Sequence, residues 1–214
     1  MYKAVIFDFD YTLGDSTNGI ALSANYALAG LGYAEKPLDE IKRTIGLSLK
    51  ETFRVLTGND DESAAAEFAR LFRMKADEVM TDNTVLYGGA REILSDLGKR
   101  RIKTGIVTTK FHYRIDAILR KFGAEKLVDV IIGGEDVNRE KPDPEGLLKA
   151  IELLGTDKRG VLYVGDSIVD AKTAQSACVD FAAVLTGTTS DFSEYDNVFI
   201  GENLYGVLDF VTKI

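Results

Sequence analysis

Two aspartates, one residue apart, end the first apolar run of the sequence. Asp8 and Asp10 stand in FDFDYTLGDS, directly after the run YKAVIF. Residues two apart in an extended chain point to the same side, so both carboxylates can face one cavity. The pair is therefore a candidate for a polar site at the end of a buried strand.

Further polar residues follow other apolar runs. Thr108 and Thr109 close the segment IVTTK, and Asp166 and Asp170 lie in LYVGDSIVD. In an open parallel sheet, ligands bind beyond the carboxyl ends of the strands. Three strands would therefore bring carboxylates or hydroxyls to one edge, where a site is expected.

Converging carboxylates repel one another unless a cation lies between them. Oxygen ligands without a histidine cluster favour Mg²⁺ over zinc or copper, and the chain has one histidine and one cysteine. Mg²⁺ is usually held by few protein ligands together with a phosphate, so we expect a phosphorylated substrate. Lys141, in REKPDP, is placed to neutralise further phosphate charge, as phosphoryl transfer requires.

The hydrophobic pattern predicts the scaffold for these residues. Apolar runs alternate with amphipathic stretches, which indicates an α/β fold with a doubly wound (Rossmann-like) parallel sheet covered on both faces. The expected strands are Ala4–Phe9, Ile102–Thr108, Val128–Ile132, Val161–Val164, Phe181–Leu185 and, more weakly, Val198–Ile200. The expected helices are Ala90–Lys99, Tyr113–Phe122, Pro144–Leu154 and Asp170–Ala177. Asp143 is expected to cap the start of the third helix and Gly155 to end it.

The alternation is interrupted between Asp15 and about Asp82, where the pattern is helical. We therefore expect an α/β catalytic core of residues 1–14 and 84–214, with an α-helical cap domain of residues 15–83 inserted after the first strand. Two chain crossings, with a glycine pair near one of them, suggest a hinged lid. The expected core of the cap consists of Tyr26, Phe53, Phe68 and Phe72.

Composition limits the functional class. The chain has 214 residues, of which 45% are hydrophobic and 28% charged, as in globular proteins. A formal net charge of −8 disfavours non-specific binding to nucleic acid or to anionic membranes. The one cysteine, Cys178, is expected to be a buried hydrophobic residue. No signal peptide is visible, and we expect a cytoplasmic monomer or homodimer that binds neither nucleic acid nor membrane.

Four segments in order, DFDYTLGDS, IVTTK, KPDP and VGDSIVD, resemble the four motifs of the haloacid dehalogenase-like hydrolases. The helical insertion after the first segment is similar to the α-helical cap of the phosphoglycolate phosphatase-like branch. The resemblance implies a Mg²⁺-dependent phosphoric monoester hydrolase. Such an enzyme would act on a small phosphorylated metabolite, phosphoglycolate-like, through an aspartyl-phosphate intermediate.

The resemblance also implies a role for each catalytic position. Asp8 would be the nucleophile and a metal ligand. Asp10 would be the general acid and base, with its backbone carbonyl on the metal. Thr108 would hold a phosphate oxygen, and Lys141 would bridge the phosphate and the nucleophile.

Metal and substrate contacts are implied in the same way. Asp166 would bind Mg²⁺ directly, and Asp170 would support it through water. Thr109, next to the phosphate-binding threonine, is a candidate substrate contact.

The segment TIGLSLKETF in the helical insertion is a candidate for substrate recognition. In the family, a loop here reaches over the active site, so Gly46, Ser48 and Lys50 are expected to contact the substrate. An ordinary turn between helices is the alternative. Related sugar phosphomutases carry arginine where this sequence has Leu49, which argues against a mutase.

Two single residues raise separate expectations. Glycine is common in the family at the position of Tyr11, which suggests a tight turn, and we expect this tyrosine to pack rather than to disturb the site. His112, the only histidine, has no adjacent partner that marks it as a base, and we expect a surface or capping role.

Other functions stay open from the sequence. Inorganic pyrophosphatase is the nearest alternative, because GIVTTK and LKETF also resemble a cap-bearing pyrophosphatase branch. Phosphonoacetaldehyde hydrolase fits less well, since its cap lysine is one position away from Lys50. A non-catalytic phospho-acceptor receiver domain would share the doubly wound sheet, but it would lack the helical insertion and the Asp8–Asp10 pair.

Overall fold

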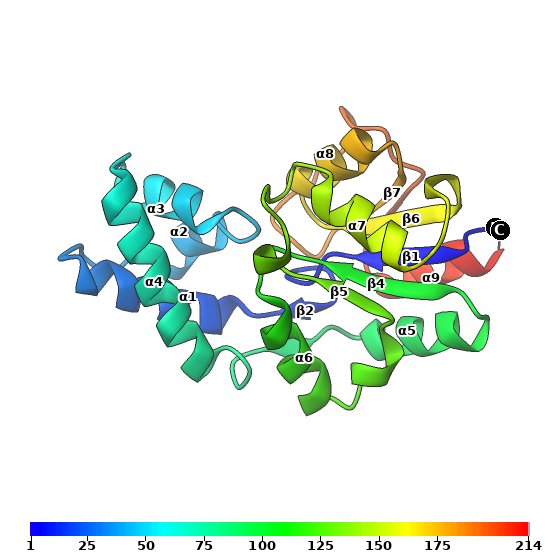
Figure 1. Ribbon diagram of the computed structural model, residues 1–214, viewed down its shortest axis with the longest axis horizontal. Coiled ribbons are helices and arrows are strands. Elements are labelled where there is room, and N and C mark those ends of the chain that lie inside the picture. The colour runs from blue at the N-terminus through cyan, green and yellow to red at the C-terminus, as the bar shows by residue number, and fades with distance from the viewer. Residues whose placement is uncertain (214) are drawn as a thin grey trace. The chain divides into compact units, whose positions relative to one another are not determined.

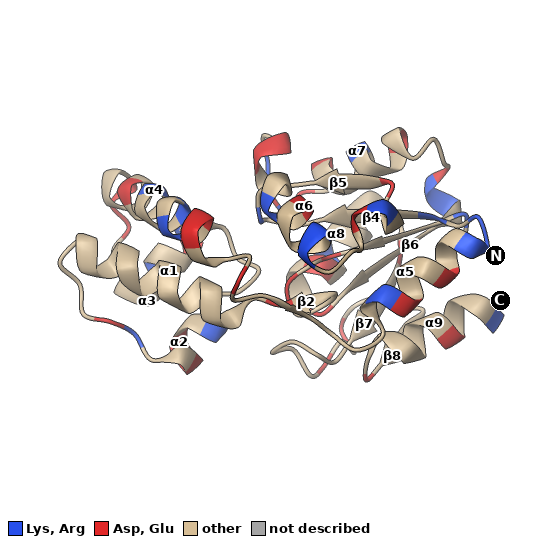
Figure 2. Cartoon of the chain, turned by 90° about the horizontal axis from the view of Figure 1, so that it is seen from below, with Lys and Arg blue, Asp and Glu red and all other residues tan. Residues whose placement is uncertain are grey.

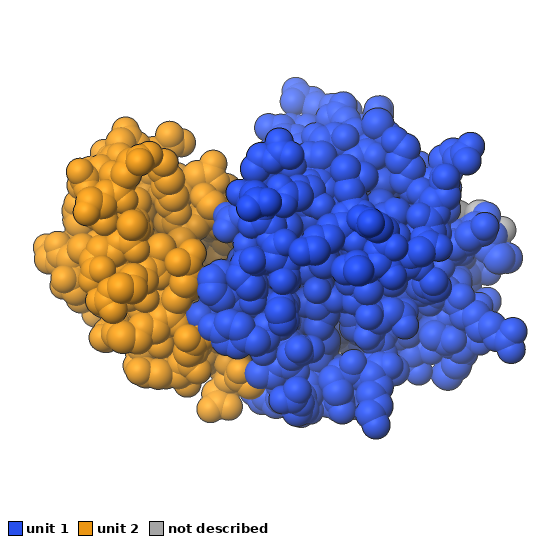
Figure 3. All heavy atoms as spheres, viewed as in Figure 1, with its two compact units in different colours: residues 1–15, 86–214 blue, residues 16–85 orange. Residues whose placement is uncertain are grey.

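The structure is a computed structural model that describes residues 1–213. The chain divides into two compact units, Met1–Asp15 with Leu86–Ile214 and Ser16–Val85 (Figure 3). The first unit is built on a β-sheet with helices, and the second is helical (Figure 1). Two short strands, β2 (Gly14–Asp15) and β3 (Val85–Leu86), pair with each other.

Within the described residues, six parallel strands form the sheet of the first unit, in the order β5-β4-β1-β6-β7-β8. Their bounds are β1 Ala4–Phe7, β4 Lys103–Val107, β5 Val130–Ile132, β6 Val161–Gly165, β7 Asp180–Val184 and β8 Phe199–Gly201. Phe7 of β1 is in register with Ile106 of β4 and Val164 of β6. The residues that follow these three strands therefore leave the sheet at the same level.

Helices cover both faces of this sheet (Figure 1). Helices α7 and α8 share a hydrophobic core with Ala4 and Ile6 of β1, and α5, α6 and α9 pack on the other side. The helix bounds are α5 Ala90–Lys99, α6 His112–Lys121, α7 Glu145–Leu153, α8 Ile168–Ala177 and α9 Leu204–Lys213, with short 3₁₀ turns η1 Glu125–Leu127, η2 Gly134–Asp136 and η3 Lys158–Gly160. The predicted doubly wound α/β fold is confirmed. Figure 2 shows that charged residues lie mainly on helices and connections, whereas the strands are mostly uncharged.

Two details of the helices bear on the sequence-based expectations. Helix α7 begins one residue later than expected, at Glu145, so Pro144 rather than Asp143 is its N-cap. The Asp143 carboxylate accepts the N–H of Glu145 at 3.0 Å, and Gly155 follows the helix with φ 60°. Cys178 is exposed, so the expectation of a buried hydrophobe is wrong. Cys178 ends α8 in the left-handed conformation, with φ 55°, and the neighbouring Ala177 and Val179 are the buried residues.

The second unit consists of α1 Thr17–Gly30, α2 Leu38–Lys42, α3 Leu49–Thr57 and α4 Glu62–Val79. Phe53, Phe68 and Phe72 are buried, and successive ring centroids lie 5.5 and 6.1 Å apart. Tyr26 is 41% exposed, so its assignment to this core is wrong. Helix α1 buries the face that carries Ala24, Ala27 and Leu28. Successive side chains on a helix are turned by about 100° around its axis, so Tyr26 lies off this buried face.

The described helices include none that is long and apolar enough to cross a membrane.

Candidate active site

Three buried carboxylates meet at the carboxyl edge of the sheet. Asp8, Asp166 and Asp170 each offer an oxygen within 4.8 Å of the others. Asp8 follows β1 and Asp166 follows β6, and the pairing of these strands continues as the Asp8 N–H donates to the Val164 carbonyl at 2.8 Å. The sheet register therefore brings together residues that are far apart in the chain.

The environment of Asp8 and Asp166 opposes their negative charge. Burial raises the pKa of Asp8 to about 7, against the opposing effect of the Lys141 ammonium. Burial, reinforced by the charges of Asp170 and Asp8, raises the pKa of Asp166 well above its usual value. The fully charged arrangement is therefore costly unless protons or a cation compensate it. An all-oxygen donor set in this environment fits a hard divalent cation.

Asp166 is held in a tightly packed position. The Thr12 hydroxyl donates to its Oδ1 at 3.1 Å. A Cβ at Gly187 would lie 1.8 Å from its Oδ2, so the loop after β7 can approach the carboxylate only with glycine there. Neither Thr12 nor Gly187 is a site residue in the sequence-based prediction, because nothing local to either residue indicates that it contacts Asp166.

Asp170 takes part in a helix cap and also lies in the group of buried carboxylates. It lies in the first turn of α8, where Ser167 and Asp170 form a reciprocal capping box. The Ser167 hydroxyl donates to Asp170 Oδ2 at 2.6 Å, which leaves Oδ1 for the site. A Cβ at Gly165 would meet the carboxylate carbon at 2.5 Å, so the glycine in VGDS allows this close approach.

Lys141 connects two of the carboxylates. Its Nζ lies 2.8 Å from Asp8 Oδ1 and 2.7 Å from Asp170 Oδ1, and the lysine side chain is only 5% exposed. Burial by itself lowers the pKa of Lys141, but Asp170 and Asp8 outweigh it and raise that pKa well above its usual value. The ammonium is thus charged and fixed. Tyr163 of β6, which the sequence analysis did not assign, donates its hydroxyl to Asp170 Oδ1 at 3.0 Å.

The Asp10 side chain has a different partner. Its carboxylate is not in the group formed by Asp8 and the two later aspartates. Instead, Lys110 Nζ lies 2.7 Å from Asp10 Oδ2, and both side chains are buried. Among described atoms, Asp10 Oδ1 is buried without a hydrogen-bond partner. Lys110 is also missing from the sequence-based prediction, although it follows Thr109 directly in IVTTK.

The two threonines after β4 differ in exposure. Thr108 is buried, and its N–H donates to the Ile132 carbonyl of β5 at 3.0 Å. Thr109 is half-buried. A Cβ at Gly134 would lie 2.6 Å from the Thr109 carbonyl oxygen, so the loops after β4 and β5 are in close contact.

His112 and two acids join the same loops at the surface. The Glu135 carboxylate accepts the His112 N–H at 2.9 and 3.0 Å and thereby caps α6. Asp136 Oδ2 lies 2.9 Å from His112 Nδ1, and this hydrogen bond raises the pKa of His112. Asp136 also accepts the Gly133 N–H at 2.9 Å. His112 is half-buried and has an acidic partner, Asp136, that the sequence does not indicate, and its capping or surface role stays a prediction.

Tyr11 occupies a tight turn after Asp10. Its φ is 60°, in the left-handed region that favours glycine, and its side chain is buried. The Tyr11 N–H donates to the Gly14 carbonyl at 2.8 Å, and the Tyr11 carbonyl accepts the Thr186 hydroxyl. The expectation that Tyr11 packs in a tight turn is confirmed.

In the helical unit, the three candidate substrate residues lie before and at the start of α3. Gly46 has φ 93°, and a Cβ there would meet no atom within 4 Å. Ser48 is the N-cap of α3 and forms a capping box with Glu51. Lys50 Nζ lies 2.6 Å from Glu62 Oε1, and the lysine side chain is 67% exposed.

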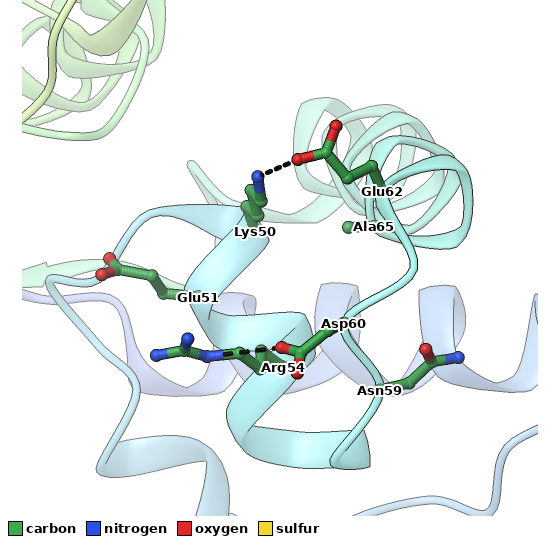
Figure 4. A pocket seen from close by; sticks show the side chains of 7 residues that line it. All are labelled: Lys50, Glu51, Arg54, Asn59, Asp60, Glu62 and Ala65. Atoms are coloured by element: carbon green, nitrogen blue, oxygen red, sulfur yellow. Dashed lines mark hydrogen bonds and ion pairs between the residues drawn. The ribbon is translucent and has the colours of Figure 1, made fainter.

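Lys50 also borders a cavity of about 260 Å³ within this unit (Figure 4). The lining residues are Lys50, Glu51, Arg54, Asn59, Asp60, Glu62 and Ala65. Figure 4 shows two ion pairs at this cavity, Lys50 with Glu62 and Arg54 with Asp60. The basic side chains at the cavity are thus already paired within the unit.

Comparison with known proteins agrees with the geometry of the first unit. The family described as haloacid dehalogenase-like hydrolase matches residues 5–184. The chain is 31% identical over 218 residues to a phosphoglycolate phosphatase of Nitrosospira multiformis, covering 99% of this chain and 96% of the relative. It is 34% identical over 199 residues to a phosphoglycolate phosphatase of Rhodospirillum rubrum, covering 87% and 81%.

A solved structure from Bacteroides fragilis, provisionally assigned as a haloacid dehalogenase-like hydrolase, is also similar. It has a TM-score of 0.92 at 43% identity and covers 95% of this chain and 98% of that chain. The family match extends over most of the chain, from β1 to the end of β7, and includes all four motifs. The chain therefore belongs to the haloacid dehalogenase-like hydrolases.

Proposed function

We propose that this enzyme is a Mg²⁺-dependent phosphatase that hydrolyses a small phosphorylated metabolite, with Asp8 as the nucleophile. Its class, a phosphatase of this hydrolase family, is supported by the family match and by the curated relatives. The observation that carries the finer proposal is the contact of Lys141 with Asp8 beside two further buried carboxylates. This arrangement supplies a carboxylate nucleophile, a fixed cation and a cation-binding edge.

Mg²⁺ fits the residues at this edge. Asp8 and Asp166 would hold the ion together with the backbone carbonyl of Asp10, and Asp170 would support it through water. The oxygen donors and the raised pKa values of Asp8 and Asp166 favour this assignment. When bound, the ion would withdraw charge from the phosphate and the nucleophile.

The protein groups divide the reaction into two displacements. In the first, an Asp8 oxygen bonds to phosphorus while the bond from phosphorus to the leaving oxygen breaks, and Asp10 gives a proton to that oxygen. In the second, water attacks phosphorus, Asp10 takes a proton from the water, and the bond to Asp8 breaks. Lys141 neutralises phosphate charge throughout, and Thr108 and Thr109 hold phosphate oxygens.

The substrate is proposed to be a phosphoglycolate-like phosphomonoester, because the similar curated proteins are phosphoglycolate phosphatases. The helical unit is proposed to act as a cap, in which Gly46, Ser48 and Lys50 contact the part of the substrate that is not phosphate. A receiver-type phospho-acceptor is not supported, since the chain belongs to a family of hydrolases. Cytoplasmic localisation and a monomeric or homodimeric state stay predictions.

The test is a turnover assay with phosphorylated metabolites, including phosphoglycolate and pyrophosphate, with Mg²⁺ and with EDTA. We expect Mg²⁺-dependent release of phosphate, with the highest kcat/KM for a small phosphomonoester. A higher kcat/KM for pyrophosphate would replace the proposed substrate class. Absence of turnover with every compound would contradict the proposed function.

A further inference from the structure

The buried lysine at the end of β4 has no role in the reaction as described so far. The Lys110 side chain is 6% exposed, and the carboxylate that it contacts, Asp10, is 10% exposed. A buried ammonium is costly unless a partner compensates its charge. Here the partner is the proposed general acid and base, which makes the pair relevant to catalysis as well as to folding.

Close backbone contacts fix the position of this lysine. Its N–H donates to the Thr108 hydroxyl oxygen at 3.2 Å, and its carbonyl accepts the Gly134 N–H at 3.1 Å. A Cβ at Gly133 would lie 2.8 Å from the Lys110 carbonyl oxygen. The loops after β4 and β5 therefore hold the lysine backbone, and the ammonium reaches Asp10 from a fixed base.

The two carboxylate oxygens of Asp10 are unequal. Oδ2 lies 2.7 Å from Lys110 Nζ, whereas Oδ1 is buried and has no hydrogen-bond partner among described atoms. A buried polar atom without a partner is rare in folded proteins and indicates a function or a missing ligand. An ammonium on Oδ2 restricts rotation of the carboxylate and leaves Oδ1 available.

We propose that Lys110 is a positioning residue that holds Asp10 by Oδ2, so that Oδ1 is the atom that transfers the proton. This inference rests on the proposed function and names the atom that performs one of its steps. In the first displacement the Oδ1–H bond breaks, a bond forms from the proton to the leaving oxygen, and that oxygen keeps the electron pair of its bond to phosphorus. In the second displacement Oδ1 takes a proton from the attacking water.

A lysine that acts through Asp10 has a distinctive kinetic signature. Alkyl phosphates need a proton on the leaving oxygen, whereas p-nitrophenolate is a stable leaving group. Loss of Lys110 should therefore slow alkyl phosphates much more than p-nitrophenyl phosphate. A lysine that bound the phosphate instead would affect both substrates equally and raise KM for both.

The experiment compares Lys110→Met, Asp10→Asn and the double variant in the intact enzyme with Mg²⁺. The substrates are p-nitrophenyl phosphate and the best alkyl phosphate of the metabolite assay. We expect Asp10→Asn to lower kcat for the alkyl phosphate by about 10²- to 10⁴-fold, the usual range for general acid–base catalysis. Lys110→Met should lower kcat for the alkyl phosphate at least about 10-fold more than kcat for p-nitrophenyl phosphate, with little change in KM. For the alkyl phosphate, kcat of the double variant should be within about 3-fold of kcat of Asp10→Asn, because both substitutions disrupt the same functional pair.

Two further variants separate positioning from a general structural effect. Lys110→Arg keeps a cationic donor for Oδ2 and should recover most of the alkyl phosphate rate. Lys103→Met removes an exposed lysine at the other end of β4, where it donates to the Leu154 carbonyl, and should leave both rates unchanged. If Lys110→Met does not fold, as judged by thermal unfolding, Lys110→Gln gives the same test with a neutral polar side chain.

Each contrary result has one meaning. Equal losses with both substrates in Lys110→Met or Lys110→Gln, or multiplicative losses in the double variant, would overturn the positioning role while leaving the proposed function intact. An Asp10→Asn variant without selective loss would overturn the role of Asp10 in the proposed function, and the inference about Lys110 with it.

Discussion

At the scale of single residues, the candidate site is an arrangement of charges that depend on one another. Lys141 contacts Asp8 and Asp170, and Tyr163 supports the second of these acids. Removing one member of a buried ion pair typically costs about 3–5 kcal/mol, because the other charge is left without compensation. Substitutions that keep polarity are therefore the informative ones at this site.

We predict that Asp8→Asn abolishes turnover while the protein stays folded. The amide keeps the size of the side chain and can still accept from Lys141, but it cannot form an aspartyl-phosphate. The expected loss in kcat is at least about 10³-fold, the scale seen when one member of a catalytic unit is removed. The measurement is steady-state turnover together with thermal unfolding. Near wild-type kcat in a folded variant would contradict the nucleophilic role.

The raised pKa of Asp8 predicts how the stability of the metal-free protein depends on pH. Its pKa rises on folding from 3.8 to about 7, so the folded protein binds a proton more tightly than the unfolded chain does. The contribution of Asp8 to the free energy of unfolding should therefore decrease as pH rises from about 4 to about 7 and stay constant above that range.

Mg²⁺ should compete with these protons and stabilise the protein more at pH 8 than at pH 5. The measurement is the change in Tm between EDTA and excess Mg²⁺ at each pH. The Asp8→Asn variant is the control, because it lacks the titrating carboxylate. An equal Mg²⁺-dependent shift at both pH values would contradict the assignment of Asp8 as a metal ligand.

At the scale of elements, the ends of strands and helices hold the proposed catalytic residues. The loops after β1, β4 and β6 supply Asp8, Thr108 and Asp166, and the register of the sheet aligns these loops. Glycines allow the closest approaches, as at Gly187 beside Asp166. Helix α8 is an exception, because it ends in the left-handed conformation that favours glycine but has Cys178 at that position.

Helix α8 ends at Cys178 with φ 55°, a conformation that costs a residue with a Cβ about 1–2 kcal/mol. We predict that Cys178→Gly raises the free energy of unfolding by about 0.5–1 kcal/mol, since glycine removes this cost but has a larger backbone entropy to lose. Cys178 is exposed, so its replacement should remove little buried apolar surface. The measurement is chemical denaturation, with Cys178→Ala as the control. A gain of equal size in the alanine variant would show that backbone conformation is not the cause.

At the scale of the whole molecule, the chain combines an α/β unit that holds the proposed catalytic residues with a helical unit inserted after β2. The proposed division of labour is chemistry in the first unit and substrate selection in the second. Lys50 is suited to test this, because its ion pair with Glu62 is exposed and contributes little to stability.

We predict that Lys50→Ala shifts relative kcat/KM among phosphorylated metabolites by roughly 10- to 200-fold, the range for one altered substrate contact. Turnover of p-nitrophenyl phosphate should change little. Glu62→Gln is the matched control, since it breaks the same ion pair but keeps the lysine. Ser48→Asp tests the neighbouring position without loss of the helix cap, because aspartate is also a good N-cap residue. A common decrease for all substrates would mean that this segment is structural.

Local patterns in the sequence predicted much of the scaffold. Helix α5 has the predicted bounds, Ala90–Lys99, because an amphipathic period is a local property. The order of strands and acids in the sequence also predicts that the acids after β1 and β6 meet, because parallel strands direct their carboxyl ends to one edge. The hydrogen bond of Asp143 at the start of α7 also depends only on its neighbours in the chain, although Pro144 takes the N-cap position predicted for Asp143.

Other features depend on which elements become neighbours, and only the tertiary structure shows them. Lys110 and Asp10 are 100 residues apart, and their ion pair requires β4 to lie next to β1. Gly187 meets Asp166 only because the loop after β7 passes beside the end of β6. Tyr26 is exposed because packing selects the other face of α1 as the buried one. The period of a segment shows that it has a buried face, but the partner that buries it, and the charges met there, are set by the order of strands in the sheet and by helix packing.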